Sequence, residues 1–302
     1  MPVTYSESLD VAIQYLQQLK ARGVKYLTVS PSTLAALSNG PRPSPPATRP
    51  VKAPRAEAAL REAPTKPVAP PASTDEGPSI AVLAPRVPSS LSGEAKAAAM
   101  SELRERALGC QKCPRLATSR QNVVFGVGDI NSPLLFVGEA PGADEDSQGE
   151  PFVGQAGQLL TRIIQTMGFP RNTVYIANVL KCRPDTPGQT AGNRKPTAEE
   201  MGTCLPYLLA QIDLIQPKII VALGGTAMEG LFGRVVAITK VRGHFQAFRD
   251  IPVMPTYHPS YLLRTQALGV KRQLWEDMLQ VLEKLGRPIS ERQRNYFLSS
   301  VQ

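Results

Sequence analysis

The sequence predicts an α/β protein: a three-layer α/β/α sandwich with a central, mainly parallel four-stranded sheet. Apolar residues form short continuous runs rather than alternating ones, which is typical of strands buried on both faces. These runs occupy residues 133–138, 174–180, 218–225 and 253–257. A helical pattern follows each run, at residues 157–167, 198–215, 226–232 and 270–285. This alternation favours a parallel sheet, whose ligand crevice lies at the carboxyl ends of the strands.

The N-terminal third differs from the rest in composition. The chain has 302 residues and 29 prolines, of which 13 fall between Pro41 and Pro88. No Phe, Trp or Tyr occurs between Tyr26 and Phe125. Such a stretch cannot bury enough apolar surface to offset its ordering entropy. We therefore expect a disordered Pro/Ala-rich linker at residues 31–96, a globular α/β domain at 97–287 and a C-terminal tail at 288–302.

Residues 1–30 contain one candidate helix, with an apolar stripe that a single helix cannot bury by itself. The stripe consists of Leu9, Ile13, Leu16 and Leu19. It either rests on the main domain or docks on a protein partner. The start of the chain lacks the basic residues and apolar core of a signal peptide, and no apolar run approaches the roughly 20 residues of a spanning helix. We expect a cytoplasmic protein that acts as a monomer away from membranes.

Charge is a weak guide to function here. The chain carries 34 Lys and Arg against 25 Asp and Glu, a net charge of +9. This excess suits nucleic acid, but many basic proteins bind none.

All four cysteines fall in the predicted domain. Cys110 and Cys113 form a C-x2-C pair before Pro114, whereas Cys182 and Cys204 are single. A reducing cytoplasm argues against disulfides, so the readings are four separate buried thiols, a zinc site or a [4Fe–4S] cluster. Zinc sites usually consist of two tight pairs, so this spacing favours the cluster.

Glycine-rich and polar segments follow the strands. The first strand leads into Gly138-Glu139-Ala140-Pro141-Gly142, then Glu145-Asp146 and a Gly-rich run from Gly149 to Gly157. Such a junction brings backbone amides to a ligand and favours an anion or nucleotide site. Asn178 ends the second strand and His258 follows the fourth, so both are candidate functional residues. The only other histidine, His244, is expected in a hairpin around Arg242-Gly243 with a structural role.

Together these residues carry a resemblance. Over about residues 100–285 the sequence resembles the iron–sulfur (family 4) uracil-DNA glycosylases of bacteria and archaea. The matching motifs are C-x2-C-P, GEAPG, the ED…G-x-PFVG-x-AG-x-LL run, N-x-x-x-C and HPS. The resemblance implies an enzyme that flips deoxyuridine out of single- or double-stranded DNA and hydrolyses its N-glycosidic bond. It also implies a structural [4Fe–4S] cluster on Cys110, Cys113, Cys182 and Cys204.

The resemblance further implies roles for individual residues. Phe152 would stack on uracil, Asn178 would read its Watson–Crick edge and His258 would donate to its O2 as the base departs. Gly138 and Ala140 would contribute to base binding, with backbone donors around Ala140. Contacts with DNA would come from Leu262, Leu263 and Arg264, which follow the HPS motif.

Two departures affect the expected chemistry. The best-known uracil-DNA glycosylases carry GQDPYH, in which the Asp positions water and the Tyr excludes thymine. Ala140 and Gly142 stand at those places here, so Glu139 and Glu145 are the candidates for positioning water, and Glu145 for filling the space of the Tyr. Relatives that trap DNA covalently carry GEQPG and an extra basic loop, which this sequence lacks. Turnover is therefore expected, and a non-catalytic or covalently trapping uracil-DNA binding protein is the alternative.

Overall fold

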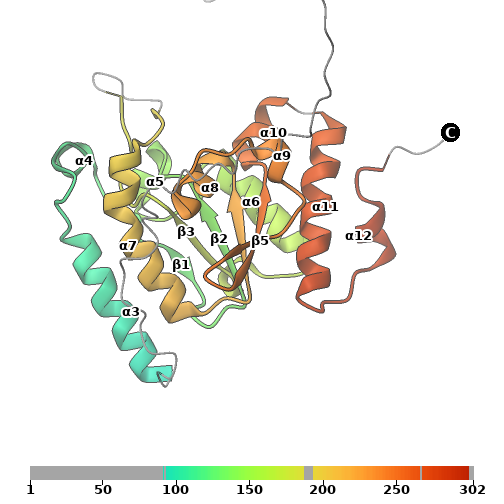
Figure 1. Cartoon of the computed structure of the whole chain (residues 1–302), viewed down its shortest axis with the longest axis horizontal. Coiled ribbons are helices and arrows are strands. Elements are labelled where there is room, and N and C mark those ends of the chain that lie inside the picture. Colours follow the sequence, from blue (N-terminus) through green and yellow to red (C-terminus); the bar gives the residue numbers. More distant parts are fainter. Residues whose placement is uncertain (1–90, 92, 187–192, 266, 299–302) are drawn as a thin grey trace, which may run out of the picture. The chain divides into compact units, whose positions relative to one another are not determined.

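The computed structural model describes residues 91, 93–186, 193–265 and 267–298. The predicted helix within residues 1–30 and nearly all of the predicted linker lie outside the described residues. The described chain forms a six-stranded sheet in the order β1-β3-β2-β4-β6-β5 (Figure 1). The predicted α/β class and the parallel arrangement of the four central strands are confirmed.

The strands are β1 (Val127–Gly128), β2 (Leu134–Gly138), β3 (Tyr175–Asn178), β4 (Ile219–Leu223), β5 (Gln246–Phe248) and β6 (Ile251–Thr256). The helices before β4 are α3 (Gly93–Leu108), α4 (Pro114–Ser119), α5 (Ala143–Gln148), α6 (Gln155–Thr166), the 3-10 helix η2 (Arg171–Thr173) and α7 (Ala198–Ile215). Those after it are α8 (Gly225–Phe232), α9 (Ile238–Val241), α10 (Pro259–Thr265), α11 (Leu268–Lys284) and α12 (Glu291–Asn295).

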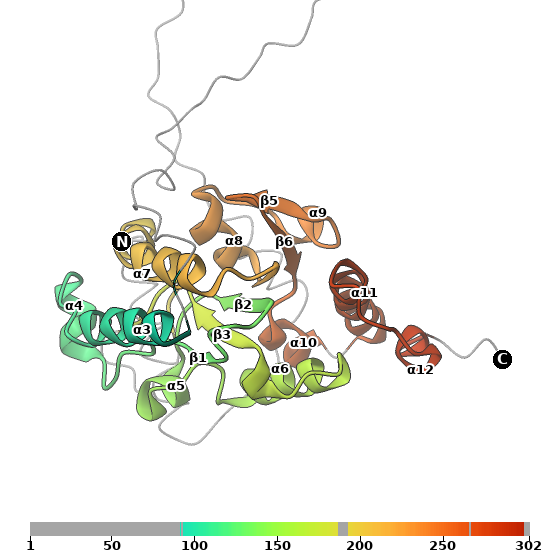
Figure 2. The ribbon, with the colours of Figure 1, turned by 90° about the horizontal axis from the view of Figure 1, so that it is seen from below.

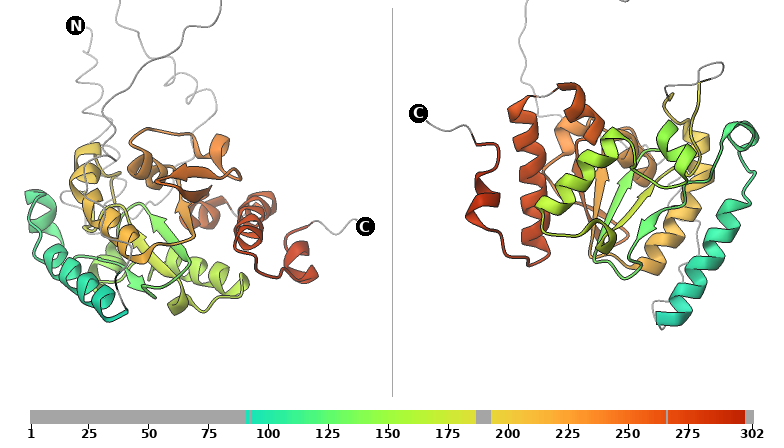
Figure 3. Two further views of the ribbon diagram at one scale, coloured as in Figure 1. Left: turned by 60° about the horizontal axis from the view of Figure 1, so that its bottom comes forward. Right: turned by 180° about the vertical axis from the view of Figure 1, so that it is seen from behind.

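Helices cover both faces of the sheet. Alternate residues of β2 point to opposite faces, as the period of a strand requires. Leu135 and Val137 join one buried cluster with α3, α7 and α8, while Leu134 and Phe136 join a second cluster with α6, α10 and α11. Figures 2 and 3 show α3 and α7 on one side of the molecule and α11 on the other. The three-layer sandwich therefore follows from continuously apolar strands.

The register of the sheet brings the ends of its central strands together. Gly138 lies opposite Asn178 on β3, and Leu223 at the end of β4 lies opposite Thr256 at the end of β6. Because the central strands are parallel, the segments that follow them meet at one edge. That edge carries the motifs singled out in the sequence.

Two short edge strands extend the four-stranded sheet that the sequence predicts. β1 and β5 pair antiparallel with β3 and β6, and they are too short to show a period in the sequence. The hairpin expected around Arg242-Gly243 is misplaced. The turn between β5 and β6 lies at Arg249-Asp250, both with positive φ (50° and 67°), as a tight hairpin turn requires. His244 precedes β5 and its Nδ1 lies 3.2 Å from the Arg242 carbonyl oxygen.

The ends of the described chain pack on the domain. Helix α3, which no sequence pattern predicted, buries Met100 and Leu103 against the α7 side of the sheet. At the other end, Trp275 Nε1 donates to the Gln293 carbonyl oxygen (2.6 Å), and the Tyr296 ring packs edge-on against Trp275. Within the described residues no helix is long and apolar enough to cross a bilayer.

Candidate active site

The carboxyl edge of the sheet contains a cavity of about 420 Å³. It lies among the segments that follow β2, β3, β4 and β6, as the strand topology predicts. Its lining consists of Glu139, Ala140, Gly142, Glu145, Phe152, Ala156, Asn178, Asn193, Gly224, Gly225, His258, Ser260 and Arg264. The structure therefore brings together the residues predicted to bind the base or act on it, except Gly138, which is buried at the end of β2 behind Asn178 and Phe152 and is not part of the lining.

Asn178 ends β3 with an unpaired acceptor. Its side chain is 2% exposed, and its Oδ1 has no hydrogen-bond partner in the described structure. Leaving a buried acceptor unpaired costs about 1–3 kcal/mol, so such a group in a cavity indicates a ligand that donates to it. The backbone of Asn178 is held by the buried Lys181, whose Nζ donates to the Asn178 carbonyl oxygen (2.9 Å).

Phe152 projects into the same cavity from a strained loop. Its φ is +56°, a left-handed conformation that bulky residues rarely adopt. Its ring centroid lies 5.7 Å from that of His258, with an interplanar angle of 34°. Gly157 makes this loop possible, since a Cβ there would lie 1.8 Å from the Phe152 carbonyl oxygen.

His258 is held in one tautomer by Ser260. The Ser260 backbone N–H donates to His258 Nδ1 (3.2 Å), and Ser260 Oγ lies 2.7 Å from the same nitrogen. Because a backbone N–H can only donate, Nδ1 accepts and the proton of the neutral ring sits on Nε2. Burial, assisted by the charge of Arg264, lowers the pKa of His258 from 6.5 to about 4. The ring is a neutral hydrogen-bond donor at neutral pH.

The two candidate carboxylates differ in their surroundings. Glu145 Oε1 accepts the N–H groups of Val153 (2.9 Å) and Gly154 (3.0 Å), and its Oε2 accepts that of Gly142 (3.0 Å). Glu139 also lines the cavity, and its carboxylate has no hydrogen bond or ion pair to any other described side chain. Both oxygens of Glu145 are therefore occupied by backbone N–H groups of Gly142, Val153 and Gly154. The carboxylate of Glu139 remains available to a ligand or to water.

Several residues in the cavity lining had not been predicted. Asn193 donates from Nδ2 to the Pro141 carbonyl oxygen (3.3 Å) and accepts from Arg183 Nε (2.9 Å). Gly224 allows β4 to end beside His258, because a Cβ there would lie 3.2 Å from that of His258. Asn193 lies outside every predicted helix and strand, whereas Gly224 lies in the Gly-Gly pair that ends the predicted strand run 218–225, which was the only available signal.

The segment predicted to contact DNA forms α10. Leu262 is 5% exposed and packs in the core, whereas Tyr261 is 38% exposed and Arg264 lines the cavity mouth. Leu263 is half-buried. Of the three residues predicted to contact DNA, only Arg264 is exposed, and the burial of Leu262 contradicts its predicted contact.

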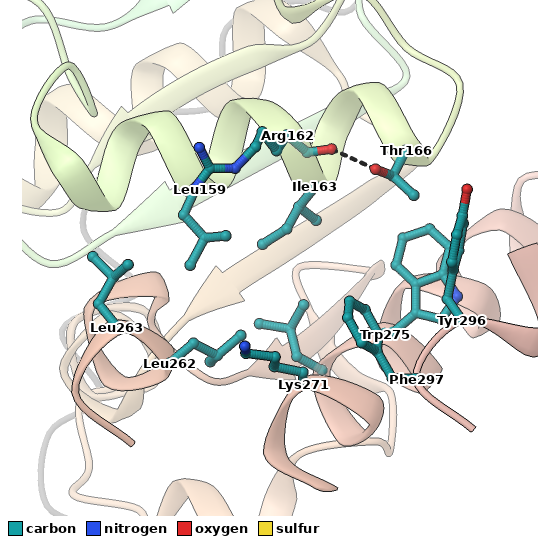
Figure 4. Close-up of a pocket in the computed structure, with 11 residues that line it drawn as sticks. Leu159, Arg162, Ile163, Thr166, Leu262, Leu263, Lys271, Trp275, Tyr296 and Phe297 are labelled. Carbon is teal, nitrogen blue, oxygen red and sulfur yellow. Dashed lines mark hydrogen bonds between the residues drawn. The ribbon is translucent and has the colours of Figure 1, made fainter. Parts of the chain in front are cut away.

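Leu262 and Leu263 also line a second cavity of about 450 Å³, an apolar groove between α6, α10 and α11. In Figure 4 Leu159 and Ile163 of α6 face the leucines of α10 across the groove. Its lining holds neither a carboxylate nor an imidazole. The chemistry that the sequence predicts therefore belongs to the cavity around Asn178 and His258.

The four cysteines come from separate segments around one end of the domain. Cys110 follows α3, Cys113 precedes α4, Cys182 follows β3 and Cys204 lies in α7, and all four are free thiols. Burial raises the pKa of Cys113 and of Cys182, and that of Cys204 to about 12, with further increases from neighbouring cysteines in each case.

Two donors face these sulfurs. Arg120 Nη1 donates to Cys182 Sγ (3.1 Å) and the Lys181 backbone N–H to Cys204 Sγ (3.2 Å). Among the described residues, no group of three or more His, Cys, Asp or Glu side chains is arranged to hold a single metal ion.

Comparisons with known proteins match most of this domain. Residues 125–280 match the family described as the uracil DNA glycosylase superfamily. The type-4 uracil-DNA glycosylase of Thermotoga maritima is 46% identical over 181 residues, 59% of this chain and 91% of that protein. The type-4 enzymes of Sulfurisphaera tokodaii and Saccharolobus solfataricus are each 41% identical, over 84% of their length and about three fifths of this chain. The chain therefore belongs to the uracil-DNA glycosylase superfamily, in its family 4.

Proposed function

We propose that this protein is a uracil-DNA glycosylase, which hydrolyses the bond between uracil and deoxyribose and leaves an abasic site. The observation that carries the proposal is the buried, unpaired Oδ1 of Asn178, which lies in one cavity with Phe152 and a neutral His258. The family-4 relatives, named as enzymes of this activity, support it.

Uracil provides the donor that Asn178 lacks. With its Oδ1 accepting from N3–H and its Nδ2 donating to O4, Asn178 would satisfy both polar groups on that edge of the base. Cytosine has an acceptor at N3, so Asn178 Oδ1 would receive no hydrogen bond from that position. Cytosine also has an amino group at C4, which would lie opposite Asn178 Nδ2, so that two donors would face each other. A site built around buried polar groups rejects such a base strongly. Phe152 would add stacking, worth about 1–3 kcal/mol per base.

His258 would act on the departing base. Cleavage passes through an oxocarbenium-like sugar while negative charge gathers on uracil. A neutral Nε2–H aimed at O2 stabilises this charge without first losing a proton, as a preorganised oxyanion donor does. The bond from Ser260 to Nδ1 keeps the proton on Nε2, so Ser260 belongs to this arrangement.

Water capture would depend on Glu139. Glu139 is among the residues that line the cavity, whereas both oxygens of Glu145 are occupied by backbone N–H groups. We therefore assign Glu139 to positioning the attacking water, and Glu145 to holding the loop. Backbone groups at Gly138 and Ala140 would complete the binding of the base.

The substrate would be DNA with the deoxyuridine flipped out of the stack. The surface of α10 next to the cavity presents Tyr261, Leu263 and Arg264. Leu263 and Tyr261 would fill the space that the base leaves, and Arg264 would contact a phosphate, which makes affinity depend on salt.

A structural [4Fe–4S] cluster would join Cys110, Cys113, Cys182 and Cys204. Four free thiols that come from separate segments at one end of the domain support it. Each corner of a cubane takes one cysteine, so the four cysteines match its number of ligands. The cluster would tie the loop after α3 to β3 and α7, and supply no step of base removal.

Oligonucleotides that carry one uracil, single- or double-stranded, test the function. Incubation followed by alkali should break the strand at the uracil, with a matched cytosine oligonucleotide as control. If the protein slows the uracil oligonucleotide in a native gel but alkali produces no strand breaks, the protein would be a non-catalytic binder. A product that survives denaturation bound to protein would indicate covalent trapping.

A further inference from the structure

We infer that Glu145 and Arg171 form a charged clamp that holds residues 151–154 in the conformation that places Phe152 in the base cavity. The inference rests on the proposed function, because the position of Phe152 matters only where a base stacks on it. Glu145 and Arg171 are then positioning residues that act through Phe152.

The loop needs such a clamp because its conformation is unfavourable by itself. A phenylalanine with φ of +56° persists only where its surroundings hold it, and residues of this kind gather at functional sites. The ring also has little room. A Cβ on Gly138 would lie 2.5 Å from Phe152 Cζ, so the ring fits closely against the end of β2.

Glu145 holds the C-terminal side of the loop. One oxygen of its carboxylate accepts the N–H groups of both Val153 and Gly154, the two residues after Phe152. The other oxygen accepts from Gly142, at the end of the GEAPG motif. Hydrogen bonds to an ionised acceptor are about twice as strong as neutral ones. The carboxylate thus fixes the stacking loop to the segment that follows β2.

Arg171 holds the N-terminal side from η2. Its Nη2 donates to the carbonyl oxygen of Pro151 (2.7 Å), the residue before Phe152, and its Nη1 donates to Thr161 Oγ1 on α6 (3.0 Å). A negative charge therefore meets the N–H groups after Phe152, and a positive charge meets the carbonyl before it. Burial lowers the pKa of Arg171, while the carboxylates of Glu150 and Glu145 oppose that change.

A double-mutant cycle tests whether Arg171 acts through Phe152. Arg171→Met is made in the wild-type and Phe152→Ala backgrounds, and kcat/KM is measured on a single-stranded uracil oligonucleotide. In the wild-type background we expect a loss of about tenfold, within the range that contacting residues show in such cycles. In the Phe152→Ala background Arg171→Met should lower kcat/KM by less than about twofold, because the ring that Arg171 positions is already absent. Equal losses in the two backgrounds, or no loss in the wild type, would overturn the clamp.

Arg249→Met is the matched control. Arg249 is buried to a similar degree and pairs with Asp213 (3.0 Å), in the turn between β5 and β6 at the opposite end of β6 from His258. Its loss should lower the melting temperature and leave kcat/KM unchanged. Glu145→Gln, which sets an amide group against backbone N–H groups, gives a second cycle with Phe152→Ala if Arg171→Met does not fold.

Hydrogen exchange separates the clamp from the activity. The amides of Val153 and Gly154 should exchange slowly in the full-length protein and faster in Arg171→Met and Glu145→Gln, while those of β4 stay unchanged. This readout needs no substrate, so a wild-type protein without excision activity would refute the proposed function and leave the clamp to be decided by exchange. Unchanged exchange of Val153 and Gly154 in both variants would contradict the clamp.

Discussion

Gly138 and Asn178 face each other in register on β2 and β3, and a Cβ at position 138 would lie 2.3 Å from Asn178 Oδ1. The absence of a side chain at the end of β2 thus leaves the space that the side chain of Asn178 occupies at the end of β3. The same missing atom gives room to the Phe152 ring.

Gly138→Ala should therefore impair catalysis more than folding. The added methyl must displace either Asn178 or Phe152, and a misplacement of about 1 Å can cost about 100-fold in rate. We expect kcat/KM on uracil DNA to fall by about that factor. Circular dichroism and the melting temperature check that the fold survives. Full activity in a folded variant would show that the cavity is not shaped as described.

Asn178→Asp should weaken the discrimination between uracil and cytosine. The aspartate keeps an acceptor but has no amide to donate to O4, and it adds a negative charge beside a base that becomes negative. Uracil excision should therefore fall, and the ratio of uracil to cytosine excision should fall with it. Release of both bases from matched oligonucleotides measures the ratio. An unchanged ratio would remove Asn178 from base recognition.

His258→Ala should reduce the rate far more than it reduces DNA binding. The loss of one preorganised donor to a developing anion typically costs about 100- to 1,000-fold in kcat. Single-turnover rates and binding isotherms on the same uracil oligonucleotide separate the two effects. Equal losses in rate and binding would give His258 a structural role only.

The pKa of His258, lowered to about 4, predicts the pH dependence. Above about pH 5 the ring is neutral, so its protonation should cause no decline in excision near 6.5, where a free imidazole titrates. Below pH 6.5 His258 is protonated in the unfolded chain, whereas in the folded chain it stays neutral until the pH falls to about 4. The stability contribution of this group is therefore complete above 6.5 and is lost as the pH falls towards 4.

Nuclear magnetic resonance of the labelled imidazoles gives this pKa directly, because the chain has only two histidines. A His244→Asn variant assigns the signals. Nδ1 should show the shift of an unprotonated nitrogen and Nε2 that of a protonated one. Titration of His258 near 6.5 would contradict the account of its burial.

The cysteines should hold iron. Full-length protein purified without oxygen should absorb visible light and contain about four irons per chain, as a cubane requires. Cys204→Ser should lose this absorbance and unfold at a lower temperature, since a cross-link between α7 and two loops is broken. A loss of about 3 kcal/mol would lower Tm by roughly 6–12 °C in a domain of this size. A colourless protein with stoichiometric zinc would contradict the cluster.

Much of the site could be predicted because it lies at strand ends. Asn178 ends one strand and His258 follows another, so the topology of a parallel sheet is enough to place them at the same edge. The sequence motifs also contain most of the side chains that line the cavity. The hydrogen-bond partners of those side chains could not be predicted. Nothing in the sequence indicates that Glu145 accepts three backbone N–H groups, because its partners come from two loops.

What the sequence missed depends on tertiary packing. Adjacent leucines at 262 and 263 look equivalent in sequence, and only the packing of α10 on the core decides that Leu262 is buried. Arg171 contributes through contacts with α6 and the loop of Phe152, which no local pattern records. Strands of two or three residues, such as β1 and β5, are held by their neighbours rather than by their own periodicity.

The most direct test of the account is the release of free base from two otherwise identical single-stranded oligonucleotides, one with uracil and one with cytosine. The wild-type protein should release uracil, leave an alkali-sensitive site in its place and give no detectable cytosine. The Asn178→Asp variant, run beside it, should release uracil more slowly and with less preference over cytosine. No release of uracil by the wild-type protein, or equal release of both bases, would contradict the claim that the unpaired acceptor of Asn178 reads uracil.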